Sequence, residues 1–312
     1  MASRRKFNKA RASKYIFCVV MAIIPVVQFL IMGFGVRLHS FVLAFQHYEN
    51  AIDGLGYDIT FAGFDNFVKA IDVFIKKSDM FKNSAILFLI CTFFGMTLSL
   101  IFSFYIYKKF AMAGLFKTVL FLPQIISGLI FATIFRYIVT DGYIYLMKVS
   151  KGVEVLGLLD DPNTRFPTLI FFNIWASFGV NVLLYTGSMS NINESIVESA
   201  KLDGVNLLQE FIHITLPLIY PTIVTFFILS MVNFVTSDYG ILNLLGTSAA
   251  AHEIGTLGFW IYQGSLGGSY VEAYRTVSMS VLAACGLFLS IIMAPLTIFV
   301  KKLLVKYGPS VD

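Results

Sequence analysis

Six long apolar stretches are the feature that most constrains how this chain folds. A helix that crosses a bilayer needs about 20 mainly apolar residues, and its backbone polar groups must be satisfied within the segment itself, which favours helices. Six stretches meet that length: about 15 to 36, 84 to 107, 116 to 138, 167 to 189, 218 to 241 and 276 to 300. The sequence therefore predicts an all-α polytopic membrane protein with about six transmembrane helices, and the lipid bilayer as its surroundings.

Composition supports this class. Hydrophobic residues make up 57% of the chain and charged residues only 13%, whereas soluble domains carry roughly a quarter charged residues. The net charge of +5 comes from basic residues that flank the apolar stretches and do not form one patch, so we expect no nucleic-acid partner. The first stretch is too long for a cleaved signal peptide and lacks a small-residue cleavage site, so it is expected to be a retained span.

The distribution of Lys and Arg predicts the orientation. If the N-terminus is inside, more than half of the 23 Lys and Arg residues fall in the short inner segments, as the positive-inside rule requires. The opposite side holds most of the acidic residues, among them Asp53, Asp58, Asp65, Asp160 and Asp161. Both termini are therefore expected to be cytoplasmic.

Two outer connections carry patterns of their own. Between residues 37 and 82, apolar side chains recur at helical spacing beside charged ones, which predicts a short amphipathic helix at the membrane surface; docking of a partner is the alternative. The apolar positions are Phe67, Ile71, Phe74 and Ile75. The connection 244–275 is rich in Gly and aromatic residues, and it can dip into the bilayer only where protein or a water-filled cavity covers its backbone.

The sequence offers no catalytic apparatus. His252-Glu253 lacks the second His of a zinc-protease helix, and Lys117 lacks the glycines of a phosphate-binding loop. The three cysteines lie far apart in apolar stretches without metal-ligand spacing. We therefore expect no catalytic residues and no metal site. A proton-coupled carrier is disfavoured, because the charged residues closest to the spans all lie near span ends: Lys117, Arg136 and Asp238.

The connection 191–217, between the fourth and fifth spans, is long for a helix connection, and long connections are usually functional or disordered. Its apolar residues recur at helical spacing on both sides of Gly204, which argues against disorder. Gly204 permits a sharp reversal, and Pro217 marks the entry of the next span. The predicted shape is helix, glycine turn, helix, on the cytoplasmic side.

This connection resembles the EAA motif of permease subunits of bacterial ATP-binding-cassette importers. The matching positions are Glu198, Ser199, Ala200, Gly204, Ile214, Leu216 and Pro217. Ser199 is the one departure, where Ala is usual, and it is a small change on a helix. The resemblance implies that the connection couples this chain to a separate ATPase subunit by docking into a groove on it.

Three shorter segments are similar to the maltose-type carbohydrate permeases: Phe121-Leu122-Pro123-Gln124, Asn173-Ile174-Trp175 and Ile261-Tyr262-Gln263. The first span matches only loosely, and the large extracellular insertion of the maltose permease is absent. The resemblance implies a permease core over 83–302, preceded by a basic N-terminus (1–14) and the first span with its outer segment (15–82). A cytoplasmic tail (303–312) follows.

The resemblance also implies the function and the partners. It implies a type I importer permease fold in the bacterial plasma membrane and transport of oligosaccharides or other carbohydrates. Its partners would be a second permease, two ATPase subunits and an extracellular solute-binding protein. ATP and Mg would be bound by the ATPase subunits, with no cofactor on this chain. A permease for a non-sugar solute, or a secondary carrier that works without ATP, remains as an alternative; the inverted repeats that would favour a carrier are not evident.

Polar residues inside the spans are the candidates for a substrate pathway, since such groups are costly unless they face a cavity or a partner helix. Asn173 and Ser177 lie on one stripe of the fourth span, and Ser230 and Asn233 lie on one face of the fifth. The maltose-type resemblance nominates as substrate pathway Gln124, Gly128, Asn173, Ser177, Ser230 and Asn233. The alternative is that these groups only form hydrogen bonds between helices.

Overall fold

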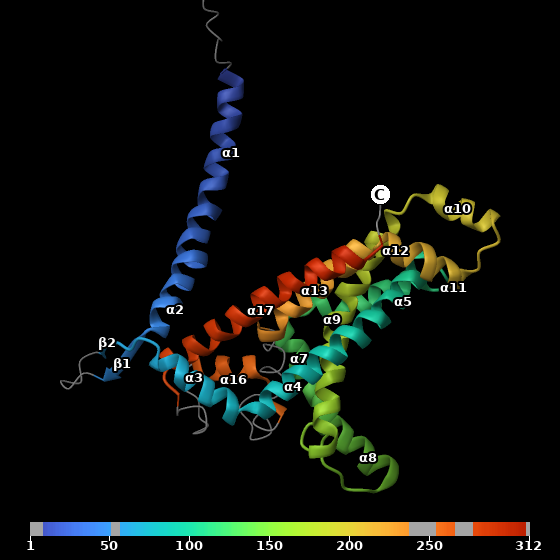
Figure 1. The fold of residues 1–312 in the computed structure, drawn as a ribbon. Helices are drawn as coiled ribbons and strands as arrows, with labels where there is room; N and C mark the ends of the chain where they lie inside the picture. The colour runs from blue at the N-terminus through green and yellow to red at the C-terminus, as the bar shows by residue number, and fades with distance from the viewer. Residues whose placement is uncertain (1–8, 51–56, 237–253, 266–276, 310–312) are drawn as a thin grey trace, which may run out of the picture. The chain divides into compact units, whose positions relative to one another are not determined.

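The computed structural model describes residues 9–50, 57–236, 254–265 and 277–309 (Figure 1). They belong to two compact units, Met1–Ile71 with Val277–Phe288, and Asp72–Thr276 with Leu289–Asp312. Several predicted features lie outside the described residues: Asp53, Asp238, the end of the fifth span at 237–241, and most of the connection 244–275.

The first unit begins with one long apolar helix. Helix α1 (Lys9–Gln28), the π-helical turn η1 (Phe29–Gly35) and α2 (Val36–Ala44) follow one another without a break. The span Lys14–Ala44 extends past residue 36, where the sequence predicted its end. Arg37 and His39 do not end the helix, because neither removes a backbone hydrogen bond as proline would.

A small hairpin and the first part of a helix follow in the first unit. Strands β1 (Gln46–Asn50) and β2 (Tyr57–Phe61) are antiparallel, with Gln46 opposite Phe61. This pair is the departure from an otherwise helical architecture. Helix α3 (Asp65–Lys76) follows, and its residues up to Ile71 belong to the first unit. It covers the positions 67–75 at which the sequence predicted an amphipathic helix.

The second unit is built around two packed spans. Helices α4 (Ser78–Leu89), η2 (Ile90–Phe94) and α5 (Gly95–Tyr107) form the span Ser78–Tyr107, and α9 (Pro162–Ser190) forms another. Buried small residues on α5 let the two helices approach. Ser103 Oγ donates to the Val182 carbonyl on α9 at 3.0 Å, and Ser99 is also fully buried.

The predicted third span, 116–138, is wrong in its boundaries. The structure divides it into α6 (Ala113–Ile125) and α7 (Gly128–Tyr137), because Ile126 and Ser127 adopt extended ψ angles of 142° and 132°. Pro123 lacks an N–H donor for the helix just before this break. Helix α7 then continues through η3 (Ile138–Gly142) and α8 (Tyr143–Lys151), so the apolar span is Gly128–Lys151.

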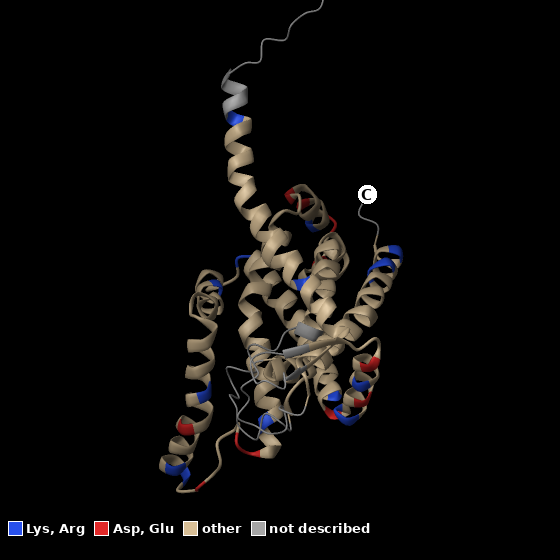
Figure 2. Ribbon diagram, turned by 90° about the vertical axis from the view of Figure 1, so that its left-hand side faces the viewer, with Lys and Arg blue, Asp and Glu red and all other residues tan. Residues whose placement is uncertain are grey.

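The remaining helices form the motif-bearing connection and the last part of the chain. They are α10 (Glu194–Leu202), α11 (Leu207–Glu210), η4 (Phe211–Thr215), α12 (Leu216–Leu218), α13 (Tyr220–Thr236), α16 (Leu257–Ser265) and α17 (Met279–Tyr307). Five helices of the described chain are long and apolar enough to span a membrane, or six if Leu207–Leu218 and Tyr220–Phe234, bent by 69°, count as one span. In Figure 2 the charged residues gather near helix ends and connections, while the long helices are mostly uncharged.

Helix α16 covers part of the predicted Gly-rich and aromatic connection. Its side chains Leu257, Phe259 and Trp260 are buried, and the Leu257 N–H donates to Ser84 Oγ on α4 at 2.9 Å. The described part of this connection is therefore covered by protein, as a backbone near lipid would have to be.

Candidate functional site

The connection between α9 and α13 folds as a helix, a glycine turn and a second helix, as the sequence predicted. Asn193 caps α10 by accepting a hydrogen bond from the Ser195 N–H at 3.1 Å. Gly204 follows α10 with φ of +77°, a left-handed conformation that favours glycine. Asn206 and Gln209 then cap α11 reciprocally, at 2.9 and 3.0 Å. The turn is thus specified by local sequence.

Helix α10 exposes a mixed surface of charged, hydroxyl and apolar side chains. Val197 is its buried residue and Ala200 is half-buried, whereas Glu198 and Ser199 are exposed. Leu202, the last residue of α10, is 89% exposed, and Leu208 on α11 is 67% exposed. Large exposed apolar side chains that flank a well-formed turn are typical of a surface that another protein covers.

A buried ion pair ties the second helix of the connection to α5. Lys108, next to the end of α5, pairs with Glu210 on α11, and their side chains are only 12% and 3% exposed. The Lys108 ammonium also lies 5.5 and 5.3 Å from the ring centres of Phe104 and Tyr107, where a cation is attracted to the ring faces. Sequence reasoning missed this pair; the signal was an acidic residue within the apolar second half of the motif.

Aromatic and aliphatic side chains also attach the second half of the connection to the spans. The Phe211 ring lies 4.8 Å from Phe104, centre to centre. Leu216 of the motif packs on a buried cluster that α5, α9 and the start of α13 share, comprising Leu100, Phe104, Tyr185, Met189 and Ile219. Ile214 and Pro217 are half-buried. The second half of the connection is thus fixed to the spans, while α10 projects from them (Figure 1).

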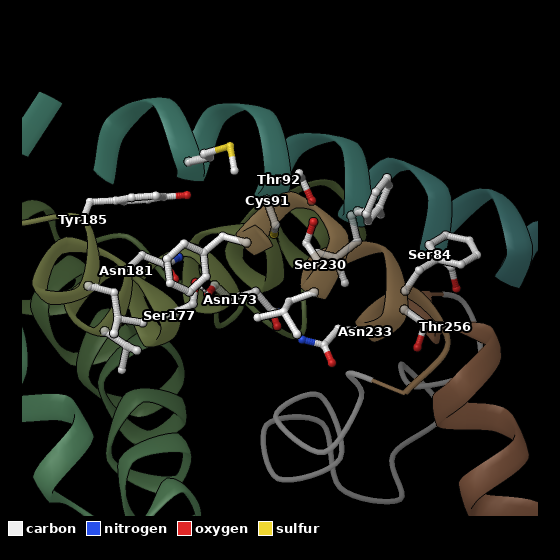
Figure 3. Close-up of a pocket in the computed structure, with 18 residues that line it drawn as sticks. Ser84, Cys91, Thr92, Asn173, Ser177, Asn181, Tyr185, Ser230, Asn233 and Thr256 are labelled. Atoms are coloured by element: carbon white, nitrogen blue, oxygen red, sulfur yellow. Dashed lines mark hydrogen bonds between the residues drawn. The ribbon is translucent and has the colours of Figure 1, made fainter. Parts of the chain in front are cut away.

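A cavity of about 440 Å³ lies in the second unit, among helices α4, α9 and α13 and residues near them. Its polar lining comes from α9 and α13 on the predicted stripes and from the span that contains α4 and η2 (Figure 3). The lining includes four predicted pathway residues: Asn173, Ser177, Ser230 and Asn233. It also includes polar positions that were not nominated: Ser84, Cys91, Thr92, Asn181, Tyr185 and Thr256.

The polar side chains of the cavity differ in how much hydrogen-bonding capacity remains for a ligand. The Asn173 amide donates to the Leu169 carbonyl at 2.9 Å, Ser177 to the Asn173 carbonyl at 2.9 Å, and Ser230 to the Phe227 carbonyl at 2.7 Å. Among the described residues, the side-chain amides of Asn181 and Asn233 make no hydrogen bond. An amide has two donors and an acceptor, so these two retain the greatest capacity to bind polar groups.

Gln124 and Gly128 do not line this cavity. The Gln124 side chain donates to the Ala176 carbonyl on α9, and Gly128 begins α7 after the break in the predicted third span. Both therefore lie at the helix break, and their role in a pathway stays a prediction.

A bundle of spanning helices around an uncharged polar cavity, with a projecting helical connection, defines a multi-pass membrane permease. The chain belongs to the family of binding-protein-dependent transport system inner membrane components, whose family model matches residues 93–306. That range runs from the end of η2 into α17, so the family match covers the motif-bearing connection and the α9 and α13 sides of the cavity, whereas α4 lies before it.

Similar proteins share this assignment. The chain is 29% identical over 221 residues to the lactose transport system permease protein LacF of Rhizobium radiobacter, covering 67% of this chain and 72% of LacF. It is 23% identical to the sn-glycerol-3-phosphate transport system permease protein UgpA of Salmonella typhi, over 96% of both chains. A solved bacterial ABC transporter involved in import of the acidic polysaccharide alginate contains a chain that superposes with a TM-score of 0.76 at 21% identity, covering 96% and 98% of the two chains. The fold is that of a type I importer permease.

Proposed function

We propose that this chain is the non-catalytic permease subunit of an ATP-driven importer of carbohydrates. The observation that carries the proposal is a connectivity: the projecting connection 191–217 joins α9 to α13, and these helices supply Asn173, Asn181 and Asn233 to the cavity. A force applied to the connection therefore acts directly on two helices that line the cavity.

The connection is proposed to dock on an ATPase subunit. Glu198, Ser199 and the nearby Leu202 are exposed for contact. Gly204 sets the reversal between the two helices. The other motif positions, Ala200, Ile214, Leu216 and Pro217, are at most half-exposed, which suits positions that hold the docking surface on the spans. Movement of the docked ATPase subunit would then move the connection and shift an equilibrium between inward-open and outward-open cavities.

The cavity chemistry favours a neutral carbohydrate. No Asp, Glu, Lys or Arg is among its described lining residues, whereas a charged solute would need a compensating charge once removed from water. Amides and hydroxyls, with the Tyr185, Phe226 and Phe234 rings nearby, match the hydroxyl groups and apolar faces of a sugar. LacF, to which the chain is similar, belongs to a lactose transport system. Charged solutes, as in the glycerol phosphate and alginate systems, fit this lining less well.

The proposed assembly contains a second permease, two ATPase subunits that bind ATP and Mg, and an extracellular solute-binding protein. Such a binding protein accompanies the alginate transporter in a second solved structure, whose similar chain has a TM-score of 0.71. The positive-inside distribution of Lys and Arg supports cytoplasmic placement of both termini and of the connection 191–217 in a bacterial plasma membrane.

Affinity purification of the tagged chain from its native membrane, followed by mass spectrometry, tests this proposal. We expect an ATPase subunit and a second permease to co-purify in mild detergent. Recovery of the chain alone, with solute uptake that persists without ATP, would instead identify a secondary carrier. If an ATPase co-purifies but only a non-sugar solute stimulates it, the chain is an importer subunit and the proposed carbohydrate substrate is wrong.

A further inference from the structure

The surface of α3 divides into three stripes along its length. One stripe faces the protein and includes the buried Asn66 and Ala70. A second is apolar and exposed, and consists of Phe64, just before the helix, with Val68, Ile71 and Ile75. A third is charged and exposed, and consists of Asp65, Lys69, Asp72 and Lys76. At 3.6 residues per turn, the apolar and charged stripes are centred roughly 100° apart.

The beginning of α3 is fixed at the end of the first span. The Asn66 side chain is fully buried and donates to the carbonyls of Ala44 and Gln46, at 3.0 and 2.9 Å. The rings of Phe64 and Phe67 lie 5.7 and 5.1 Å from that of Phe45, which directly follows α2. These contacts all lie within the first unit, so α3 starts where the apolar span Lys14–Ala44 leaves the bilayer.

The other end of α3 is held close to the next span by the shortness of the chain between them. The helix ends at Lys76, and the span Ser78–Tyr107 begins two residues later. Consecutive spans enter and leave on the same side of a membrane, so both ends of α3 are at one membrane boundary. The helix of 12 residues is about 18 Å long at about 1.5 Å per residue. It therefore runs along that boundary, whatever the orientation of the chain.

The exposed apolar stripe is large for a helix in water. Phe64 is 73% exposed, Val68 60% and Ile75 68%, and Phe61 at the end of β2 is 82% exposed. The charged stripe carries two acids and two bases, so it offers no net charge to a strongly charged partner or lipid. Apolar side chains beside a charged stripe, on a helix held at the membrane boundary, are the features of an interfacial helix.

We propose that α3, together with Phe61 and Phe64, binds the lipid interface. The apolar stripe enters the region between headgroups and acyl chains, and the charged stripe faces the headgroups and water. Such a helix buries its apolar face about 5–10 Å deep. It would hold the ends of the first two spans at a defined depth. This inference does not depend on the transported solute or on the ATPase.

Depth-dependent fluorescence quenching in the assembled transporter tests this proposal. In a background with the exposed Cys18 replaced by Ala and with Cys91 and Cys285 retained, a bimane label is placed by Val68→Cys and, as the matched control one residue away on the charged stripe, by Lys69→Cys. The background without an introduced cysteine gives the fluorescence to be subtracted. Transport by each labelled variant establishes that the assembly is intact. Quenchers are lipids with a doxyl group near the headgroup or near the acyl-chain end, and aqueous iodide.

We expect the label at 68 to lose fluorescence most strongly with the shallow doxyl lipid and weakly with iodide, and the label at 69 to show the reverse. A label at 68 that iodide quenches as strongly as at 69 would place the stripe in water and overturn the proposal. A label at 68 that neither lipid nor iodide quenches would show that a protein covers the stripe, which would equally overturn it. Ile71→Cys and Asp72→Cys form a second pair for the case in which the first pair loses transport.

Discussion

Lys108 and Glu210 form an ion pair that joins the end of α5 to the second helix of the motif-bearing connection. Both side chains are largely removed from solvent, and the Phe104 and Tyr107 rings flank the ammonium. Removing one partner leaves an uncompensated buried charge, which destabilises a protein far more than the loss of a surface pair does. The pair thereby links the connection proposed to receive the ATPase motion to the second span.

Removal of one charge of this pair should be strongly destabilising. We expect Glu210→Gln to lower the free energy of unfolding by about 3 kcal/mol, the range found when one partner of a buried pair is removed. Transport per ATP hydrolysed should also fall, because the ion pair no longer helps to fix α11 to α5. The thermal unfolding midpoint of the purified transporter and the ratio of uptake to hydrolysis measure the two effects.

The control for the pair is Lys109→Gln, which removes an exposed positive charge next to Lys108 and should change neither quantity. The exchange of both charges, Lys108→Glu with Glu210→Lys, should recover part of the loss. Equal effects of Glu210→Gln and Lys109→Gln would mean that the pair has no special coupling role.

The exposed end of α10 provides a test of docking that leaves internal packing intact. Leu202 is 89% exposed, so Leu202→Lys removes almost no contact within this chain. It should nevertheless reduce co-purification of the ATPase and, with it, transport, since burial of an apolar side chain contributes roughly 1.5–3 kcal/mol, or about 10- to 100-fold in affinity. Leu156→Lys changes a similarly exposed leucine, at 63%, outside the connection, and should have no effect. Retention of ATPase in both variants would argue against docking at α10.

The two free amides of the cavity should matter more than its serines. Asn181→Leu and Asn233→Leu remove groups that have no hydrogen-bond partner among the described residues, and each is expected to weaken transport several-fold, because a hydrogen bond contributes about 0.5–1.5 kcal/mol. Ser177→Ala and Ser230→Ala remove hydroxyls already bonded to their own helices and should have small effects. Initial uptake rates at several substrate concentrations, in membranes with equal transporter content, distinguish the two groups. The opposite order would place the substrate contacts elsewhere.

A close helix contact predicts different outcomes for two glycines of α9. A Cβ at Gly179 would contact the Leu120 carbonyl oxygen and lie 2.8 Å from its carbonyl carbon, so Gly179→Ala forces α6 and α9 apart. We expect a loss of about 1–3 kcal/mol in stability, as in other overpacked contacts. Gly187 has no atom within 4 Å of such a Cβ, and Gly187→Ala should leave stability unchanged or raise it by about 0.5–1 kcal/mol. Thermal unfolding midpoints in detergent compare the two, and equal midpoints would contradict the packing.

Hydropathy predicted most of the fold, because spanning helices must be long and apolar. It did not predict the break at Ile126 and Ser127, since both residues fit an apolar span and the break lies in backbone angles. It also ended the first span too early, because a single Arg and a nearby His lower the local hydropathy without interrupting the helix. The short hairpin before α3 carried no strong strand pattern.

The candidate sites were predicted unequally. The glycine turn followed from local motif spacing, and Asn173 and Asn233 followed from their positions within spans. Thr92 and Ser84 were missed, because small hydroxyl residues in apolar helices often bond to their own backbone and carry no distinct signal. Lys108 and Glu210 are far apart in the sequence, so their pairing depends on tertiary packing that a single sequence does not reveal.

The most direct test of the account is ATP hydrolysis by the complete transporter in proteoliposomes, with its own solute-binding protein and a panel of neutral oligosaccharides and charged solutes. We predict that a neutral oligosaccharide stimulates hydrolysis and is itself taken up, and that Leu202→Lys strongly reduces both. Uptake of the sugar without ATP hydrolysis, or stimulation by charged solutes alone, would contradict the account.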